Sequence, residues 1–354
     1  CNSNLPNPAI DPNAGDNPTK YFNTVLYTGD SSTGKAITGV GFQPDWTWVK
    51  SRNTGGEANK VVDVLRGAGI TLFPSGTSAE VDYSGGVGHD SFDSDGFTVS
   101  HSSSNNQWNV SGRTYVAWNW KAGGAGESNT DGTTESTVSV SEDAGFSIAT
   151  YTGTGATATV GHGLSKAPNV TIIKPRNFSD NWIFTHDMED GSDDQLYLNL
   201  TNASSSPSAS FTVSQNASTI GLPSWNNVND TGDTYVMYCF TEKEGYSKFG
   251  KYKGNGSANG SFVFTGFKPA YVLIKQQSAG SNWTVYDAVR DPHNAVQKIM
   301  YPGVQGIAEN TGTDRIDFLS NGFKWREASN DNGSGFTHYY MAFAEQPFKY
   351  ANAR

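Results

Sequence analysis

Apolar and aromatic residues along the chain occur in short runs of four to seven residues, separated by clusters of Gly, Ser, Thr, Asn and Asp. Runs of this length predict β-strands, and the polar clusters between them predict turns. Asp95-Gly96 and Asn321-Gly322 lie between apolar residues and predict tight hairpins, because both residue types tolerate a positive φ. The pattern therefore predicts an all-β protein of short antiparallel strands.

The same spacing of residues occurs three times, which indicates an internal triplication. A Tyr-x-Gly motif is followed 17 residues later by a Pro, with the pairs Tyr27 and Pro44, Tyr151 and Pro168, and Tyr252 and Pro269. A Lys comes six residues after each Pro, and an Asp comes 18 or 19 residues after it: Lys50 and Asp63, Lys174 and Asp187, Lys275 and Asp287. A last strand-like run starts 71, 67 and 71 residues after the Pro, at Tyr115, Tyr235 and Tyr340.

We therefore expect three tandem antiparallel β-sandwich repeats, jelly-roll-like and about 100 residues each. The expected division is an extended N-terminal arm (1–20), repeat 1 (21–121), a Gly/Ser/Thr-rich linker (122–145), repeat 2 (146–245) and repeat 3 (246–354). The composition of the linker predicts a flexible or loosely extended connection. Repeats 2 and 3 join through a short junction, so we expect them to form a rigid pair and repeat 1 to be more independent.

Composition narrows the range of partners. The chain has 354 residues, 24 basic and 34 acidic, for a net charge of −10, and it shows no Lys/Arg cluster. This balance argues against binding to nucleic acid or to anionic membranes. The longest apolar runs are far shorter than the roughly 18 residues that a membrane-spanning helix needs. We expect neither nucleic-acid partners nor membrane insertion.

Catalytic and metal-binding motifs are not apparent in the sequence. The histidines lack the spacing of a zinc site, and no P-loop, Gly-x-Ser-x-Gly or Cys–His motif occurs. The acidic stretch at 187–194 fails the calcium-loop pattern because His186 and Met188 occupy ligand positions. Three full copies also have no reason to share one asymmetric active site. We expect no metal, no cofactor and no enzymatic activity, and a glycan depolymerase with distant paired carboxylates is an alternative.

Three tryptophans are candidates for contact with a ligand or partner. Trp108, Trp225 and Trp325 precede the last strand of their repeats, in polar segments such as Asn105-Asn106-Gln107-Trp108-Asn109. An exposed Trp in a polar loop can stack on a sugar face or anchor a protein contact. The alternative is that each Trp folds back onto its own sheet or packs on a neighbouring chain.

The shared Lys and Asp positions suggest a structural contact within each repeat. Lys50, Lys174 and Lys275 lie on a strand face that carries apolar residues, where an unpaired ammonium is costly. Because Asp63, Asp187 and Asp287 are the acids at a shared offset, we predict a Lys–Asp ion pair in each repeat. The alternative is that each Lys extends to water at the strand end while the Asp opens a turn.

The chain resembles a family of tandem-repeat virion proteins of marine bacteriophages, described as tail-fibre or structural proteins. The resemblance covers nearly all of residues 21–354. It is carried by Ile-Thr-Gly-Val-Gly-Phe-Gln-Pro-Asp at 37–45, Thr-Tyr-Val-Ala-Trp-Asn-Trp-Lys-Ala-Gly-Gly at 114–124, Gly-Tyr-Ser-Lys-Phe-Gly at 245–250 and Tyr-Met-Ala-Phe-Ala-Glu-Gln-Pro-Phe-Lys at 340–349. The family contributes no catalytic residues.

The resemblance implies a non-enzymatic virion protein at the particle surface, as a tail fibre, an appendage or a capsid decoration. Its expected partners are other virion proteins, further copies of itself, with a homotrimer among the options, and a host surface glycan. The alternative from another class is a bacterial cell-surface carbohydrate-binding or adhesion module.

Overall fold

The protein is seen here as a computed structural model that describes residues 5–102, 108–186, 194–205, 213–306, 308–328 and 330–351. Antiparallel sheets are the main regular structure of the described chain, which confirms the all-β expectation. Helical structure in this part is limited to single turns. These are α1 (Asn226–Asn229) and 3-10 turns at Pro12–Ala14, Pro18–Lys20, Asn330–Asn332 and Phe348–Tyr350.

Each repeat contains an inner sheet in which the same four-strand order recurs. In repeat 1 the order is β1 (Phe22–Thr28), β9 (Thr114–Trp120), β3 (Trp46–Ser51) and β4 (Lys60–Asp63). In repeat 2 it is β12 (Phe146–Thr152), β19 (Thr234–Phe240), β14 (Val170–Pro175) and β15 (Ile183–His186). In repeat 3 it is β20 (Ser247–Lys253), β27 (Thr337–Pro347), β22 (Phe267–Gln276) and β23 (Trp283–Asp287).

An outer sheet faces each inner sheet and encloses a hydrophobic core with it. The outer sheet of repeat 1 is β2 (Lys35–Thr38), β8 (Gly96–Val99) and β7 (His89–Asp93). That of repeat 2 is β13 (Ala158–Gly161), β18 (Thr219–Leu222) and β17 (Ser214–Gln215). That of repeat 3 is β21 (Phe262–Phe264), β26 (Gly322–Trp325), β25 (Asn310–Leu319) and β24 (Val296–Ile299). A small pair, β5 (Ile70–Thr71) and β6 (Val81–Asp82), extends repeat 1.

The Tyr-x-Gly motif attaches the first strand of each repeat to the segment before its last strand. The Tyr hydroxyl donates to a backbone carbonyl there, from Tyr27 to Trp108, from Tyr151 to Val228 and from Tyr252 to Asp331. A Cβ on the motif Gly would collide with the backbone of the residue two positions after that carbonyl. The colliding pairs are Gly29 with Val110, Gly153 with Asp230 and Gly254 with Gly333. The motif is therefore a packing requirement of the fold.

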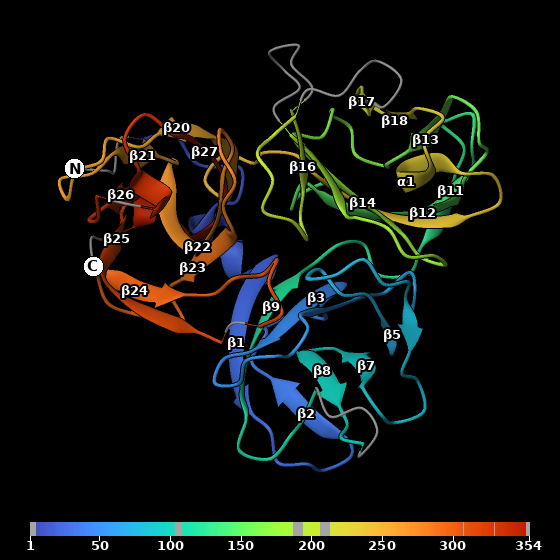
Figure 1. Cartoon of the computed structure of the whole chain (residues 1–354), viewed down its shortest axis with the longest axis horizontal. Helices are drawn as coiled ribbons and strands as arrows, with labels where there is room; N and C mark the ends of the chain where they lie inside the picture. The colour runs from blue at the N-terminus through green and yellow to red at the C-terminus, as the bar shows by residue number, and fades with distance from the viewer. Residues whose placement is uncertain are drawn as a thin grey trace.

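The three repeats surround a common centre. Figure 1 shows them as three lobes, with repeat 1 below and repeats 2 and 3 above. The largest hydrophobic cluster contains residues from all three inner sheets. Trp120, Phe240 and Phe343 hold equivalent places in the last strands. The ring of Phe343 lies 5.7 Å from that of Trp120 and 6.0 Å from that of Phe240. Inner strands are therefore covered on both faces, which explains why every residue of β3 and of β14 is buried.

The structure corrects the expected division of the chain at 122–145, where a flexible linker was predicted. This segment forms β10 (Glu127–Asn129) and β11 (Ser136–Ser141), which pair side by side and extend the inner sheet of repeat 2 at β12. On the opposite edge of the same sheet, β16 (Asp194–Tyr197) pairs with β15. Repeat 1 also shares the central cluster with both other repeats. The expectation that repeat 1 is more independent is therefore wrong.

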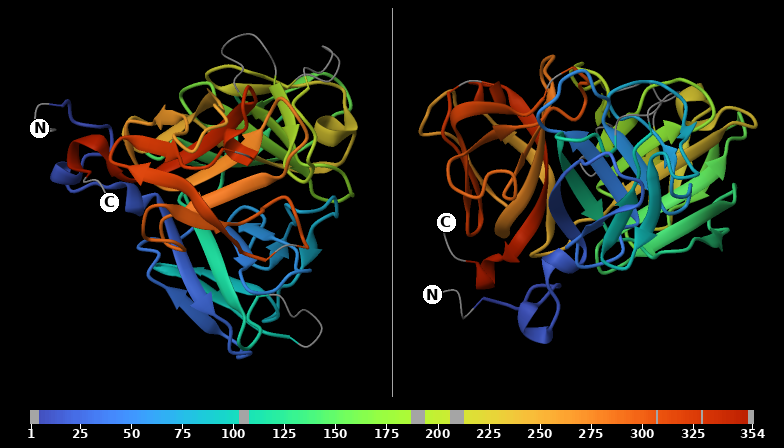
Figure 2. Two further views of the ribbon diagram at one scale, coloured as in Figure 1. Left: turned by 60° about the vertical axis from the view of Figure 1, so that its left-hand side comes forward. Right: turned by 90° about the horizontal axis from the view of Figure 1, so that it is seen from below.

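The register of the third repeat also differs from the sequence alignment. Tyr27 pairs with Tyr115 and Tyr151 with Tyr235, but Tyr252 pairs with His338. His338, not Tyr340, is thus the equivalent of Tyr115 and Tyr235. The N-terminal arm returns to the end of this repeat, where Asp11 accepts a hydrogen bond from Tyr350, and Figure 2 shows both terminal segments on one side of the molecule.

Candidate functional site: the junctions between repeats

The three tryptophans proposed as ligand contacts have different environments. Trp108 and Trp325 are 1% and 0% exposed, so the prediction that they contact a ligand is wrong for both. The Trp108 ring packs edge-on against His89, and the Lys60 ammonium lies 5.6 Å from it. Trp325 packs with Tyr252 and Tyr286 in the core of repeat 3. Trp225 is half-buried against the core of repeat 2. The polar residues around them in the sequence concealed these core positions.

The predicted Lys–Asp pairs do not form in the two repeats where both partners are described. Lys50, Lys174 and Lys275 are almost fully buried, and each ammonium donates to one backbone carbonyl of another repeat. Lys50 Nζ lies 3.1 Å from the carbonyl oxygen of Val304, Lys174 Nζ 3.2 Å from that of Thr77, and Lys275 Nζ 3.2 Å from that of Thr201. Asp187 lies outside the described residues.

The aspartates at the shared offset bind arginines instead. Asp63 and Asp287 are fully buried, and each forms an ion pair with an Arg three residues later, Arg66 and Arg290, whose side chains are 0% exposed. The Arg66 Nε lies 2.6 Å from Asp63 Oδ2. Both aspartates also accept a hydrogen bond from an aromatic residue of the next repeat. Tyr238 donates to Asp63 at 2.7 Å and Trp118 to Asp287 at 3.1 Å.

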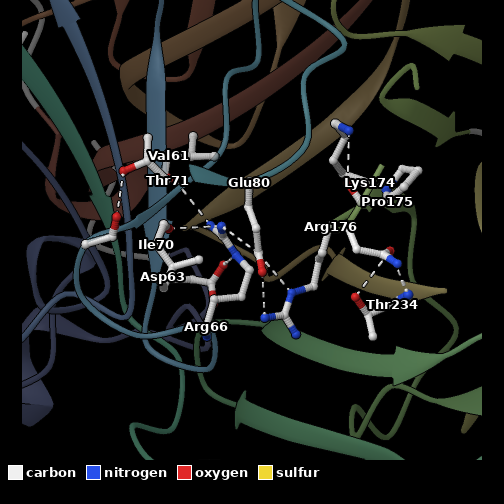
Figure 3. Close-up of polar contacts among 12 residues, drawn as sticks. Val61, Asp63, Arg66, Ile70, Thr71, Glu80, Lys174, Pro175, Arg176 and Thr234 are labelled. Carbon is white, nitrogen blue, oxygen red and sulfur yellow. Dashed lines mark hydrogen bonds and ion pairs between the residues drawn. The ribbon is translucent and has the colours of Figure 1, made fainter. Parts of the chain in front are cut away.

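A glutamate links each of these clusters to a second arginine across the junction. Figure 3 shows the cluster between repeats 1 and 2, with Arg66 and Arg176 on either side of Glu80. Arg176 binds Glu80 through two nitrogens, at 2.9 and 3.0 Å. Between repeats 3 and 1, Arg52 binds Glu309 in the same bidentate way, at 3.1 and 3.0 Å. Bidentate arginine pairs fix orientation as well as distance.

A further side chain next to each lysine donates across the same junctions. Trp283 pairs with Lys275 in the inner sheet of repeat 3. Asn59 and Trp182 come directly before β4 and β15, where continuing the registers Val49–Lys60 and Ile173–Ile183 by one residue sets them opposite Lys50 and Lys174. Asn59 donates to the carbonyl of Pro302, Trp182 to that of Phe73 at 3.1 Å and Trp283 to that of Tyr197 at 2.9 Å. Thus side chains of repeat 1 donate to carbonyls of repeat 3, those of repeat 2 to repeat 1, and those of repeat 3 to repeat 2. We call this cyclic set of contacts the junction ring.

The junction between repeats 2 and 3 is the exception in the ring. The place of Arg52 and Arg176 is held by Gln277, and the place of Trp118 and Tyr238 by Met341, which has no hydrogen to donate. The backbone contact is kept, because the Ser204 N–H donates to the Gln277 carbonyl at 2.8 Å, as Glu80 does to Arg176. The described part of this junction therefore keeps the backbone and lysine contacts without the charged cluster.

Burial shifts the protonation equilibria of the junction lysines. Desolvation lowers the pKa of Lys50, Lys174 and Lys275 to about 8 each, because burial disfavours the charged ammonium. Burial, together with the charge of Lys50, lowers the pKa of Lys60 to about 7. Within the described residues these polar groups are directed at backbone carbonyls and at each other. Their arrangement stabilises the association of the repeats.

One more recurring residue, an Asn in each repeat, was not identified from the sequence. Asn109, Asn229 and Asn332 follow the carbonyls bound by the Tyr-x-Gly tyrosines, and each accepts a hydrogen bond from the backbone N–H of Asp30, Thr154 or Asn255. Their signal was a constant spacing of six residues before Tyr115, Tyr235 and His338. It becomes visible only with the correct register of repeat 3.

Nearly the whole chain matches one protein family. The model of a domain of unknown function, DUF7483, matches residues 17–347. The chain belongs to the DUF7483 family. Because the match runs through all three repeats, the DUF7483 unit is the closed ring and not a single repeat. No curated protein and no solved structure matches the chain.

The described surface of the DUF7483 domain carries two pockets of similar size. One, of about 490 Å³, is lined by Leu5 and Pro6 of the N-terminal arm, by Phe264 and Phe348 of repeat 3 and by Glu242 at the end of repeat 2. The other, of about 430 Å³, lies on repeat 2 beside Arg176. In the described part of the chain, no three His, Cys, Asp or Glu side chains are grouped as metal ligands would be. No helix there is long and apolar enough to span a bilayer.

Proposed function

We propose that the chain is a non-enzymatic structural protein of a bacteriophage virion, as a tail fibre, an appendage or a capsid decoration. In this proposal its three lobes are tandem jelly-roll-like sandwiches that hold loop surfaces toward a host cell or neighbouring subunits at the virion surface. The virion role rests on the resemblance of the sequence motifs to phage structural proteins.

The observation that carries the non-enzymatic role is the use made of the recurring polar residues. The lysines and the Trp/Asn donors recur in every repeat, and the Asp–Arg pairs recur in two repeats. All of them are buried between repeats, bound to backbone carbonyls or to one another. Residues retained in this way hold one body together, which is what a particle component requires.

The carbohydrate-binding alternative has lost most of its support. It relied on exposed tryptophans, and two of the three are core residues. Trp225 is the remaining side chain on which a glycan contact could be built, and it packs partly against its own repeat.

Immunogold electron microscopy of phage particles from the source of the sequence tests the virion role. The antibody is raised against the recombinant chain, and antibody pre-absorbed with the same chain is the control. Label at a constant place on the particle supports the proposal and assigns the position. Label on the bacterial envelope with bare particles would overturn it and favour the adhesion module.

A further inference from the structure

The outer sheet of repeat 3 ends in an exposed aromatic strand. β21 is an edge strand, paired on one side with β26. Its residues alternate, with Val263 in the core at 6% exposure and Phe262 and Phe264 at 47% and 59%. Phenylalanines rarely stand this exposed on a sheet edge, because an unpaired apolar edge invites pairing with another chain.

The fold itself does not require this aromatic pair. Alignment of the three outer sheets through Ile37, Val160 and Val263 sets the equivalents of Phe262 and Phe264 in the other repeats. They are Ala36 and Thr38 in repeat 1, and Thr159 and Gly161 in repeat 2. Four small residues thus serve the same structural role.

Repeat 2 shows that this edge can accept another strand. Thr134 forms a parallel bridge with Val160, and its N–H donates to the Thr159 carbonyl at 2.9 Å. The segment that covers β13 comes from the insertion before repeat 2, and repeat 3 has no such insertion. Within the described residues, no backbone hydrogen bond from outside the sheet reaches Phe262 or Phe264.

The backbone of β21 is oriented for pairing at its free side. The Ser261 carbonyl accepts from the Trp325 N–H, which makes Ser261 a hydrogen-bonded partner of β26. Because hydrogen-bonding direction alternates along an antiparallel strand, the N–H and C=O groups of Phe262 and Phe264 point away from β26. Both residues therefore direct their backbone groups to the free edge, while their side chains lie on the outer face of the sheet, where Phe264 also lines the pocket beside the N-terminal arm.

We propose that β21 is a homodimer interface, at which two copies of the chain pair antiparallel about a twofold axis through Val263. The sequence Phe-Val-Phe is symmetric about Val263, so Phe262 of one copy faces Phe264 of the other, twice. Each Phe pair exchanges two backbone hydrogen bonds, and the rings form cross-strand aromatic pairs. The four-stranded outer sheets join into one sheet across the axis. A twofold contact uses the same patch on both copies and closes the assembly at two.

This interface does not depend on a virion role, so the two proposals are tested separately. The first test is sedimentation velocity of the full chain from nanomolar to high micromolar concentration. We expect a concentration-dependent monomer–dimer equilibrium. The double variant Phe262→Ala/Phe264→Thr carries repeat 1's own residues at these places and should weaken dimerisation roughly 10-fold or more. Phe336→Thr, at a Phe that is 42% exposed and lies outside β21, is the control and should leave it unchanged.

A cysteine test fixes the register. Phe262→Cys and Phe264→Cys are made separately in a Cys1→Ser background, then mixed and oxidised. Facing residues of a hydrogen-bonded antiparallel pair have Cα atoms about 5.5 Å apart, within disulfide reach. Diagonal residues lie about 7–8 Å apart. We expect a mixed 262–264 disulfide to predominate. A chain that stays monomeric at every concentration, or equal disulfide yields within each variant alone, would overturn the proposal.

Discussion

Replacing Arg66 by Met is the sharpest test of the junction ring. The guanidinium is 0% exposed. Besides Asp63, it donates to the carbonyls of Ile70 at 3.0 Å and Val61 at 3.3 Å. Met fills the aliphatic volume of the side chain but leaves both carbonyls without this donor and the carboxylate without its counter-ion. Tyr238 and the backbone N–H of residue 66 still donate to Asp63.

The expected cost follows from breaking a buried ion pair. Removing one partner of such a pair destabilises proteins by about 3–5 kcal/mol, because the remaining charge is desolvated and unpaired. Asp63→Asn removes that charge. The double variant Arg66→Met/Asp63→Asn should therefore lose less than the sum of the two single losses, with a coupling of about 0.5–3 kcal/mol.

Guanidinium denaturation followed by tryptophan fluorescence measures these free energies of unfolding. Arg52→Met is the matched control, since it removes the same chemistry from a side chain that is 18% exposed, and about 1 kcal/mol is expected there. A loss for Arg66→Met no larger than that for Arg52→Met, or strict additivity with Asp63→Asn, would refute the role assigned to the cluster.

Three further outcomes are expected. Between about pH 8 and 10.5 the unfolded chain binds more protons at Lys174 than the folded one, so stability rises with pH there. Lys174→Met should remove part of that rise in denaturation curves, and an unchanged slope would contradict the buried charge. Gly153→Ala should lower stability by about 1–3 kcal/mol, whereas Gly76→Ala, with open space around it, should not. Residues 1–121 alone should give a poorly dispersed amide NMR spectrum, because the shared centre is missing. A native-like spectrum would show independent folding.

Much of the fold could be predicted from the sequence because each repeat is local. The Tyr-x-Gly motif, the strand after each Pro and the six-residue offset to each Lys all lie within one repeat. The register of repeat 3 could not be predicted in this way. Tyr340 starts an aromatic run like those at Tyr115 and Tyr235, whereas the residue at the equivalent place in the sheet is His338. The insertion at 122–145 has the composition of a linker, yet strand pairing with β12 gives it order.

The partners of the site residues were beyond sequence reasoning for a physical reason. The shared offset correctly singled out Lys174 as a structural residue, but its acceptor, Thr77, lies in another repeat and is a backbone carbonyl, which has no sequence signature. The Arg three residues after Asp63 and Asp287 was visible. It was overlooked because Asp190 takes its place in repeat 2.

Because the three lobes belong to one polypeptide, substitutions can change each lobe separately. In an assembly of three identical chains, every substitution appears at all three positions, and a sticky edge would appear three times. In this single chain, a substitution changes one lobe only. The aromatic residues of β21, which are small residues at the equivalent places of the other two lobes, illustrate this. Such a ring can expose an aromatic edge on one lobe alone, as at Phe262 and Phe264, or replace one junction arginine by Gln277, while the equivalent positions of the other lobes stay unchanged.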